Sequence, residues 1–185
     1  MTSDRSLLGL LDDLEQQASG LALVERDLEV EDRSRAEYAR VTLASRLHAL
    51  GGREVRLTLL GGLALAGEVG RTGPDWLLLV DAQRREWVVR HAAVAAVRGA
   101  ASRAVADGAL GVLHRLSLRS VLRGIGELGA GCVLHLVDGS RRDGQLVRLG
   151  QDFAEVRPDG AGPRSTERDL VPLASLAAVQ RRDQA

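Results

Sequence analysis

The chain has 185 residues, no net formal charge and 45% hydrophobic residues, which suffices for one or two small domains with ordinary cores. Four residues are aromatic, so Leu, Val and Ala must build those cores, and a single cysteine excludes an internal disulfide. Without an apolar run of about 18 residues or an N-terminal signal pattern, we expect a soluble cytoplasmic protein with no membrane association.

Charge is distributed unevenly along the chain. Residues 1–32 hold nine acids and two arginines, hence −7, whereas the remainder holds 16 acids and 23 bases, hence +7. Every base is arginine, a residue suited to phosphate and carboxylate, although such uniform usage also fits a coding bias of the genome.

The acidic segment 1–50 is predicted to be helical. Leucines at helical spacing predict a helix over 5–18, and a looser apolar stripe predicts a longer one over 22–49 that ends at Gly51-Gly52. Two interpretations of the longer helix remain open: a coiled-coil or partner helix, and an ordinary helix packed on its own domain.

Five short strands are predicted next. Alternation predicts a strand over 55–59, Gly61-Gly62 a hairpin turn, and Gly67 a bend inside the strand over 63–70. Strands over 75–80 and 86–90 follow, and a short turn leads to a fifth. Five short, bent antiparallel strands indicate a small closed or nearly closed barrel.

A helical connector is predicted over 101–129. Its segment 114–128 is the stronger helix and carries Arg115, Arg119 and Arg123 on one face. This stripe could contact phosphates, pair with the N-terminal acids or simply be solvated. A helix-turn-helix over 103–126 is a weaker interpretation.

The strand pattern then recurs. Residues 52–79 match 129–156 at a shift of 77, and VVRHAAVAAV (88–97) matches LVPLASLAAV (170–179) at a shift of 82. The sequence therefore predicts a mainly β protein with helices (α+β), with two tandem five-stranded Sm-like/SH3-like barrels at 51–100 and 130–183, each preceded by a helix, plus the N-terminal helices.

VRLTLLGGLALAGEV…DWLLL resembles the first Sm motif of the bacterial RNA chaperone Hfq, and VVRHAAVAAV resembles its second motif. The resemblance covers about 48 residues of each half, and the whole chain is also similar to uncharacterised two-barrel proteins of high-GC bacteria. It implies ring assembly, in which strand four of one barrel pairs with strand five of the next, and binding of uridine-rich RNA near Arg90 and His91. The chain departs from the family where Asp75 takes the place of the base-stacking aromatic, and where Pro172 and Leu173 take the place of Arg90 and His91 in the second repeat.

Catalytic and metal chemistry is not indicated. The four histidines share no metal-ligand spacing, and no nucleophile-base arrangement is suggested, so we expect no enzyme, no cofactor and no metal. Cys132, which replaces Val55, is expected to be a buried structural thiol, and His135 a solvated side chain. Trp76 and Trp87 are interpreted as core packing or, alternatively, as an exposed interaction patch.

Two functions remain open. As a regulatory nucleic-acid binder, the protein would hold RNA or DNA phosphates through Arg90, Arg115, Arg119 and Arg123, with the acidic N-terminus as an intramolecular competitor. As an assembly module, it would form homo-oligomers or hold a partner protein through barrel edges or the N-terminal helices.

Overall fold

The computed structural model describes residues 33–99, 116–162 and 165–182, in two units, Met1–Val41 and Thr42–Ala185. In the first unit, residues 33–38 are helical, and the helix predicted over 5–18 lies outside the described residues. The helix predicted over 22–49 does not run through to its end. Thr42 is extended, and its Oγ1 accepts a hydrogen bond from the Ser45 amide at 3.1 Å, so a new helix, α2 (Leu43–His48), begins there.

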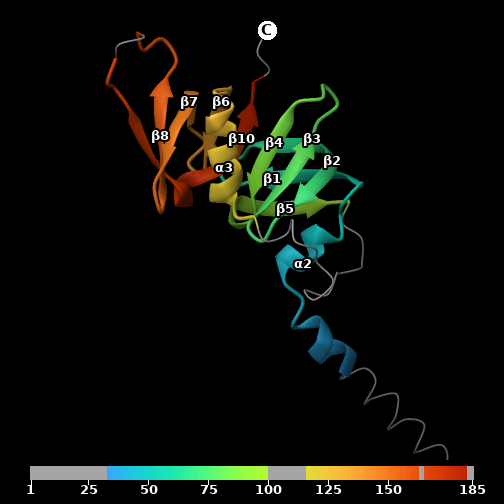
Figure 1. Cartoon of the computed structure of the whole chain (residues 1–185). Helices are drawn as coiled ribbons and strands as arrows, with labels where there is room; N and C mark the ends of the chain where they lie inside the picture. Colours follow the sequence, from blue (N-terminus) through green and yellow to red (C-terminus); the bar gives the residue numbers. More distant parts are fainter. Residues whose placement is uncertain (1–32, 100–115, 163–164, 183–185) are drawn as a thin grey trace, which may run out of the picture. The chain divides into compact units, whose positions relative to one another are not determined.

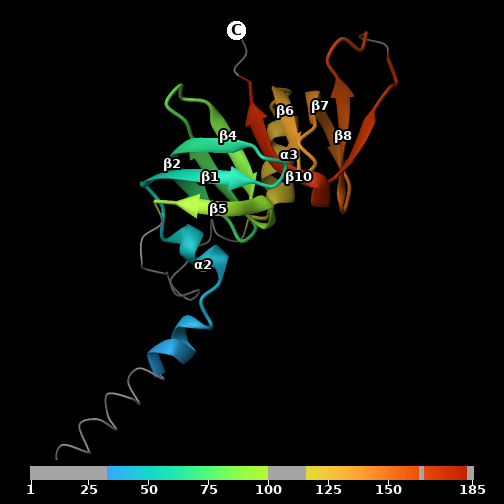
Figure 2. The ribbon, with the colours of Figure 1, turned by 180° about the vertical axis from the view of Figure 1, so that it is seen from behind.

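The second unit is built from ten strands and two α-helices in its described part (Figures 1 and 2). The first five strands are β1 (Glu54–Leu59), β2 (Ala64–Thr72), β3 (Trp76–Val80), β4 (Glu86–Arg90) and β5 (Val94–Arg98). After α3 (Leu118–Glu127) come β6 (Gly131–Leu136), β7 (Arg141–Leu149), β8 (Phe153–Pro158), β9 (Asp169–Pro172) and β10 (Leu176–Arg181). We call β1–β5 the first repeat and β6–β10 the second repeat.

The prediction of two separate barrels is wrong. All ten strands form one antiparallel sheet in the order β5-β1-β2-β3-β4-β10-β6-β7-β8-β9, and this sheet is not closed into a barrel. Val179 on β10 lies opposite Leu134 on β6 and also opposite Val88 on β4, so β10 joins the two repeats. Alternation predicts which face of a strand is buried, but it does not specify which neighbour satisfies each edge.

The repeat itself is present in the strand register. Leu57 lies opposite Val97 in the first repeat, and their counterparts Leu134 and Val179 lie opposite each other in the second. The irregularities between β2 and β3 and between β7 and β8 also fall at corresponding positions. The two shifts read from the sequence therefore identify structurally equivalent residues.

Two apolar cores share residues across the junction. The first repeat's core takes in Ala177 and Ala178 of β10, whereas the second repeat's core takes in Trp76 and Val88. Helix α3 packs on β7 and buries Leu118, Leu122 and Ile125 in the second core. The repeats are therefore joined by packing as well as by hydrogen bonds.

Candidate functional site

Arg90 and His91, the residues that the Hfq resemblance implies for RNA, take part in the junction and the core. The Arg90 Nη1 donates to the carbonyl oxygens of Ala174 at 2.7 Å and Leu176 at 3.2 Å. His91 is buried, and neither ring nitrogen has a hydrogen-bond partner among the described residues. Burial, together with the nearby His48, lowers the pKa of His91 to about 4, so at neutral pH the ring carries no charge for a phosphate.

The arginine stripe is described in part. Arg115 lies outside the described residues, whereas Arg119 and Arg123 are exposed on α3, one turn apart. Glu127 is exposed one turn further along, so the positive stripe ends there.

Trp76 and Trp87 are buried, at 6% and 5% exposure, so neither forms an exposed aromatic patch. The Trp76 Nε1 donates to the Leu116 carbonyl at 2.7 Å, and the Trp87 Nε1 donates to the Asp81 carboxylate at 3.0 Å. Each indole thus has the polar partner that a buried tryptophan needs.

The predictions for Cys132, as a buried thiol, and for His135, as a solvated side chain, have different outcomes. Cys132 is fully buried, as predicted, and burial raises the pKa of its thiol to about 11. His135 is partly buried, because the junction brings Trp87 of the first repeat against it, with ring centroids 5.4 Å apart. The prediction of a solvated histidine is therefore wrong, since β10 carries the second repeat's outer face against the first repeat.

The sheet ends in two edge strands, β5 and β9. These edges are a candidate site whose residues the sequence analysis did not name. At the internal junction, Ala178 and Val179 of β10 and Val88 of β4 are all at most 6% exposed. At the sheet ends, the equivalent Ala96 is exposed, Val97 is partly exposed and Leu170 is 66% exposed. The same positions are thus covered where a neighbouring repeat is present and open where it is not.

A groove of about 380 Å³ runs beside β9. It is lined in part by Leu136, Leu170 and Pro172. In the first repeat, the surface beside the equivalent strand β4 is covered by β10 and by Val137, which pack on the first core. The signal for this edge was available in the sequence: Leu170 continues the repeated apolar pattern on an end strand.

Metal binding and membrane crossing have no support in the described residues. No group of three or more His, Cys, Asp or Glu side chains is placed there to hold a metal ion. The helices of this part of the chain are too short or too polar to cross a bilayer.

The chain was compared with known proteins in two ways. It matches no protein-family model and no curated protein.

Proposed function

We propose that this protein is a non-enzymatic assembly module whose copies join edge to edge, β9 of one copy pairing with β5 of the next. The observation that carries the proposal is the exposure of Ala96 and Leu170, whose counterparts are buried at the internal junction. An unpaired edge is a template for a further strand, and main-chain hydrogen bonds supply the affinity of such an addition. The Sm-like resemblance implies the same pairing between neighbouring units.

The internal junction sets the register of this contact. Within the chain, β10 pairs with β4 as Ala178↔Val89, Val179↔Val88 and Gln180↔Trp87. Applying the shift of 82 residues places Ala96 opposite Val171, Val97 opposite Leu170 and Arg98 opposite Asp169 of the next copy.

Charge favours this register. Arg98 lies directly opposite Arg56 on β1, and like charges in a cross-strand pair are destabilising. Asp169 of the next copy would supply the opposite charge to this pair. Within the described part of the single chain, the only ion pair of Asp169 is a long one, 3.8 Å from Arg142, and the two side chains are 40% and 47% exposed.

The symmetry of the product follows from the use of two different edges. Pairing of β5 with β9 is heterologous, so repetition gives a ring if the rotation closes and a filament if it does not. An isologous dimer through β5 alone would use one edge only, and mutation can therefore distinguish the two arrangements.

Two variants, each blocked at one edge, test the proposal. Leu170→Asp blocks β9 and Ala96→Asp blocks β5, because each would bury an unpaired charge in the contact. We expect sedimentation velocity and light scattering to show oligomers for the unmodified chain and monomers for each variant. An equimolar mixture should give dimers and nothing larger, because only one intact contact remains.

Val147→Asp, at an exposed β7 position away from both edges, is the matched control and should oligomerise normally. The proposal would be overturned if the unmodified chain stayed monomeric at high concentration. Full assembly of Leu170→Asp would overturn the role of β9.

Nucleic-acid binding is the second candidate, and the exposure of Arg119 and Arg123 on one face of α3 favours it. Each phosphate contact adds affinity that falls with salt. We expect Arg119→Gln/Arg123→Gln to weaken binding of single-stranded RNA or duplex DNA and to flatten its salt dependence. Arg53→Gln/Arg148→Gln, which removes two other exposed arginines, should do neither. The hypothesis fails if the full chain binds neither nucleic acid at low salt.

A further inference from the structure

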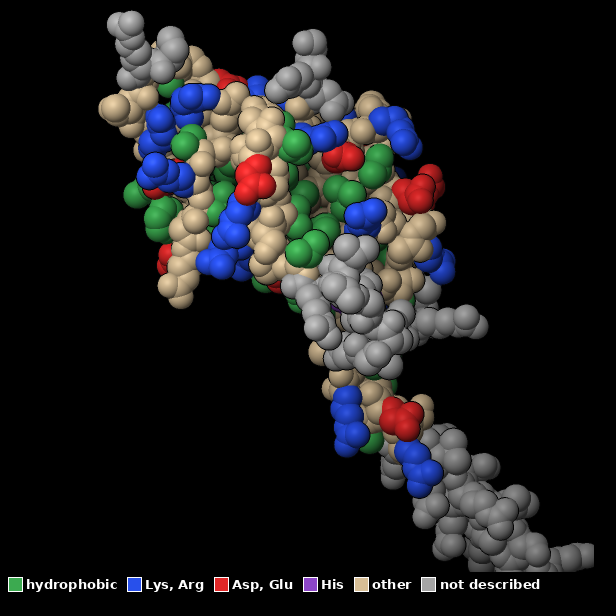
Figure 3. Space-filling view, viewed as in Figure 1, with side chains coloured by type: hydrophobic (Ala, Val, Ile, Leu, Met, Phe, Trp, Pro, Cys, Tyr) green, Lys and Arg blue, Asp and Glu red, His purple; other side chains and the backbone are tan. Residues whose placement is uncertain are grey.

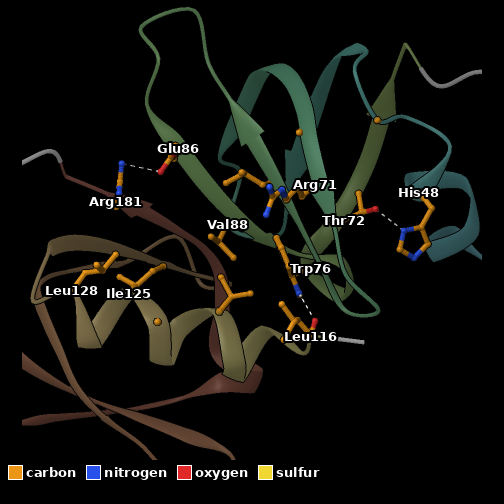
Figure 4. A pocket seen from close by; sticks show the side chains of 15 residues that line it. His48, Arg71, Thr72, Trp76, Glu86, Val88, Leu116, Ile125, Leu128 and Arg181 are labelled. Atoms are coloured by element: carbon orange, nitrogen blue, oxygen red, sulfur yellow. Dashed lines mark hydrogen bonds and ion pairs between the residues drawn. The ribbon is translucent and has the colours of Figure 1, made fainter. Parts of the chain in front are cut away.

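A groove of about 560 Å³ lies between α3 and the β2–β4 part of the first repeat. Figure 3 shows apolar side chains gathered in a hollow on this face, and Figure 4 shows the lining residues. Its apolar lining comes from β3 and β4 on one side and from α3 and the residue after it on the other: Trp76, Leu78, Val88, Val121, Ile125 and Leu128. The volume lies in the range of about 300–1,000 Å³ that small-molecule sites occupy.

The walls of the groove are fixed by contacts of the first repeat with the start of α3 and with β10. Beside the start of α3, the Trp76 Nε1 donates to the Leu116 carbonyl, and the Leu118 amide donates to the Asp75 carboxylate at 2.8 Å. Further along, Arg181 of β10 forms an ion pair with Glu86 of β4 at 3.0 Å. The groove is therefore formed without a ligand, which reduces the ordering cost of binding.

Gly124 leaves space in the groove that the fold itself does not require. A Cβ built on Gly124 meets no atom of the described residues within 4 Å, although glycine inside a helix costs about 0.5–1 kcal/mol relative to alanine. Gly126 differs, because a Cβ there would lie 3.1 Å from the Leu146 carbonyl oxygen and would press on β7. Packing therefore accounts for Gly126, whereas Gly124 only keeps the groove open.

The polar groups of the groove define the charge of an occupant. Glu86 is paired with Arg181, and the His48 ring hydrogen-bonds with the Thr72 hydroxyl at 2.6 Å. Arg71, exposed on β2 and lining the same hollow, has neither a hydrogen bond nor an ion pair within the described residues (Figure 4). An apolar groove with one uncommitted guanidinium is complementary to an apolar body that carries one negative group.

We propose that this groove binds a small amphipathic carboxylate, with its apolar body between α3 and β3–β4 and its carboxylate on Arg71. Apolar burial would supply most of the affinity, at roughly 25 cal/mol per Å², and the guanidinium would orient the ligand. A neutral hydrocarbon would leave Arg71 without a partner. A polyphosphate would leave the apolar walls uncovered. The groove is separate from the sheet edges β5 and β9, so this proposal can be tested independently of the assembly function.

Titration with decanoate, followed by calorimetry and tryptophan fluorescence, tests the proposal on the full chain. Decanoate should bind in the micromolar to submillimolar range, and Gly124→Leu should weaken it by at least roughly tenfold by filling the groove. Because leucine suits a helix better than glycine, Gly124→Leu should retain or raise the melting temperature, so lost binding would not reflect unfolding. Gly124→Ala, which adds one methyl group, should bind decanoate nearly as well as the unmodified chain.

Arg71→Gln separates the charge from the groove. It should weaken decanoate binding roughly threefold to tenfold while leaving binding of 1-decanol unchanged. Saturable decanoate binding that is unaffected by Gly124→Leu would overturn the site. Equal effects of Arg71→Gln on decanoate and decanol would overturn the role of Arg71, and no decanoate binding at 1 mM would overturn the whole proposal.

Discussion

At the scale of single residues, His91 places a titratable ring at a position of the repeat where the second copy has an apolar side chain. The second repeat has Leu173 at the equivalent position, at the start of a matching short 3-10 helix. His91 fills that place with a buried ring whose nitrogens lack hydrogen-bond partners in the described structure, 6.1 Å from the His48 ring centroid. A buried neutral histidine makes stability depend on pH.

Stability should fall as pH drops through the window between the two pKa values of His91. Its pKa is about 4 in the folded protein and 6.5 when unperturbed, so below pH 6.5 the unfolded chain takes up a proton that the folded chain does not. The contribution, on the order of 3 kcal/mol, is fully present above pH 6.5 and is lost by about pH 4.

Thermal unfolding of His91→Leu between pH 7 and pH 4 measures this effect. We expect a much flatter pH dependence than in the unmodified chain. Part of the slope should remain, because burial and the nearby Arg141 also lower the pKa of His135. An unchanged slope would show that His91 does not titrate in this window.

At the scale of elements, the close approach of β2 to β3 and of β7 to β8 depends on Gly67 and Gly144. A Cβ at Gly67 would overlap the carbonyl oxygen of Val80, and a Cβ at Gly144 would overlap that of Arg157. Both glycines thus permit the same close approach between neighbouring strands, one in each repeat.

Gly67→Ala should lower the free energy of unfolding by about 1–3 kcal/mol, because the strands must separate to admit the methyl group. Gly70→Ala on the same strand is the control. Its Cβ would meet the Leu78 side chain at 3.5 Å, an ordinary contact, so it should change stability little. Chemical denaturation measures both variants, and equal effects would contradict a specific role for Gly67.

At the scale of the whole second unit, the continuous sheet and the shared cores predict that both repeats unfold together. Arg90 on β4 supports this coupling through its two hydrogen bonds to carbonyls of the second repeat. Arg90→Leu would leave those carbonyls without their charged donor at a partly buried position.

Calorimetry should show one transition for Thr42–Ala185 in the full chain. Arg90→Leu should lower its midpoint by several degrees, for a loss of about 1–3 kcal/mol, whereas Arg119→Leu at an exposed position should have little effect. Two well-separated transitions in the unmodified chain would contradict the coupling.

The sequence by itself determined the repeat, the strands and the special in-strand glycines Gly67 and Gly144, because these depend on local alternation and backbone sterics. It also indicated the buried thiol of Cys132 through the equivalent Val55. Only the tertiary structure decided that β10 joins β4, since strand edges are backbone groups that any neighbouring strand can satisfy.

That one pairing also changed the interpretation of the candidate residues. It uses Arg90 at the junction, covers His135 with Trp87, and leaves β5 and β9 as the open ends of the sheet. These contacts join residues more than 40 positions apart in the sequence. Over that separation, no local sequence pattern specifies which residues pair.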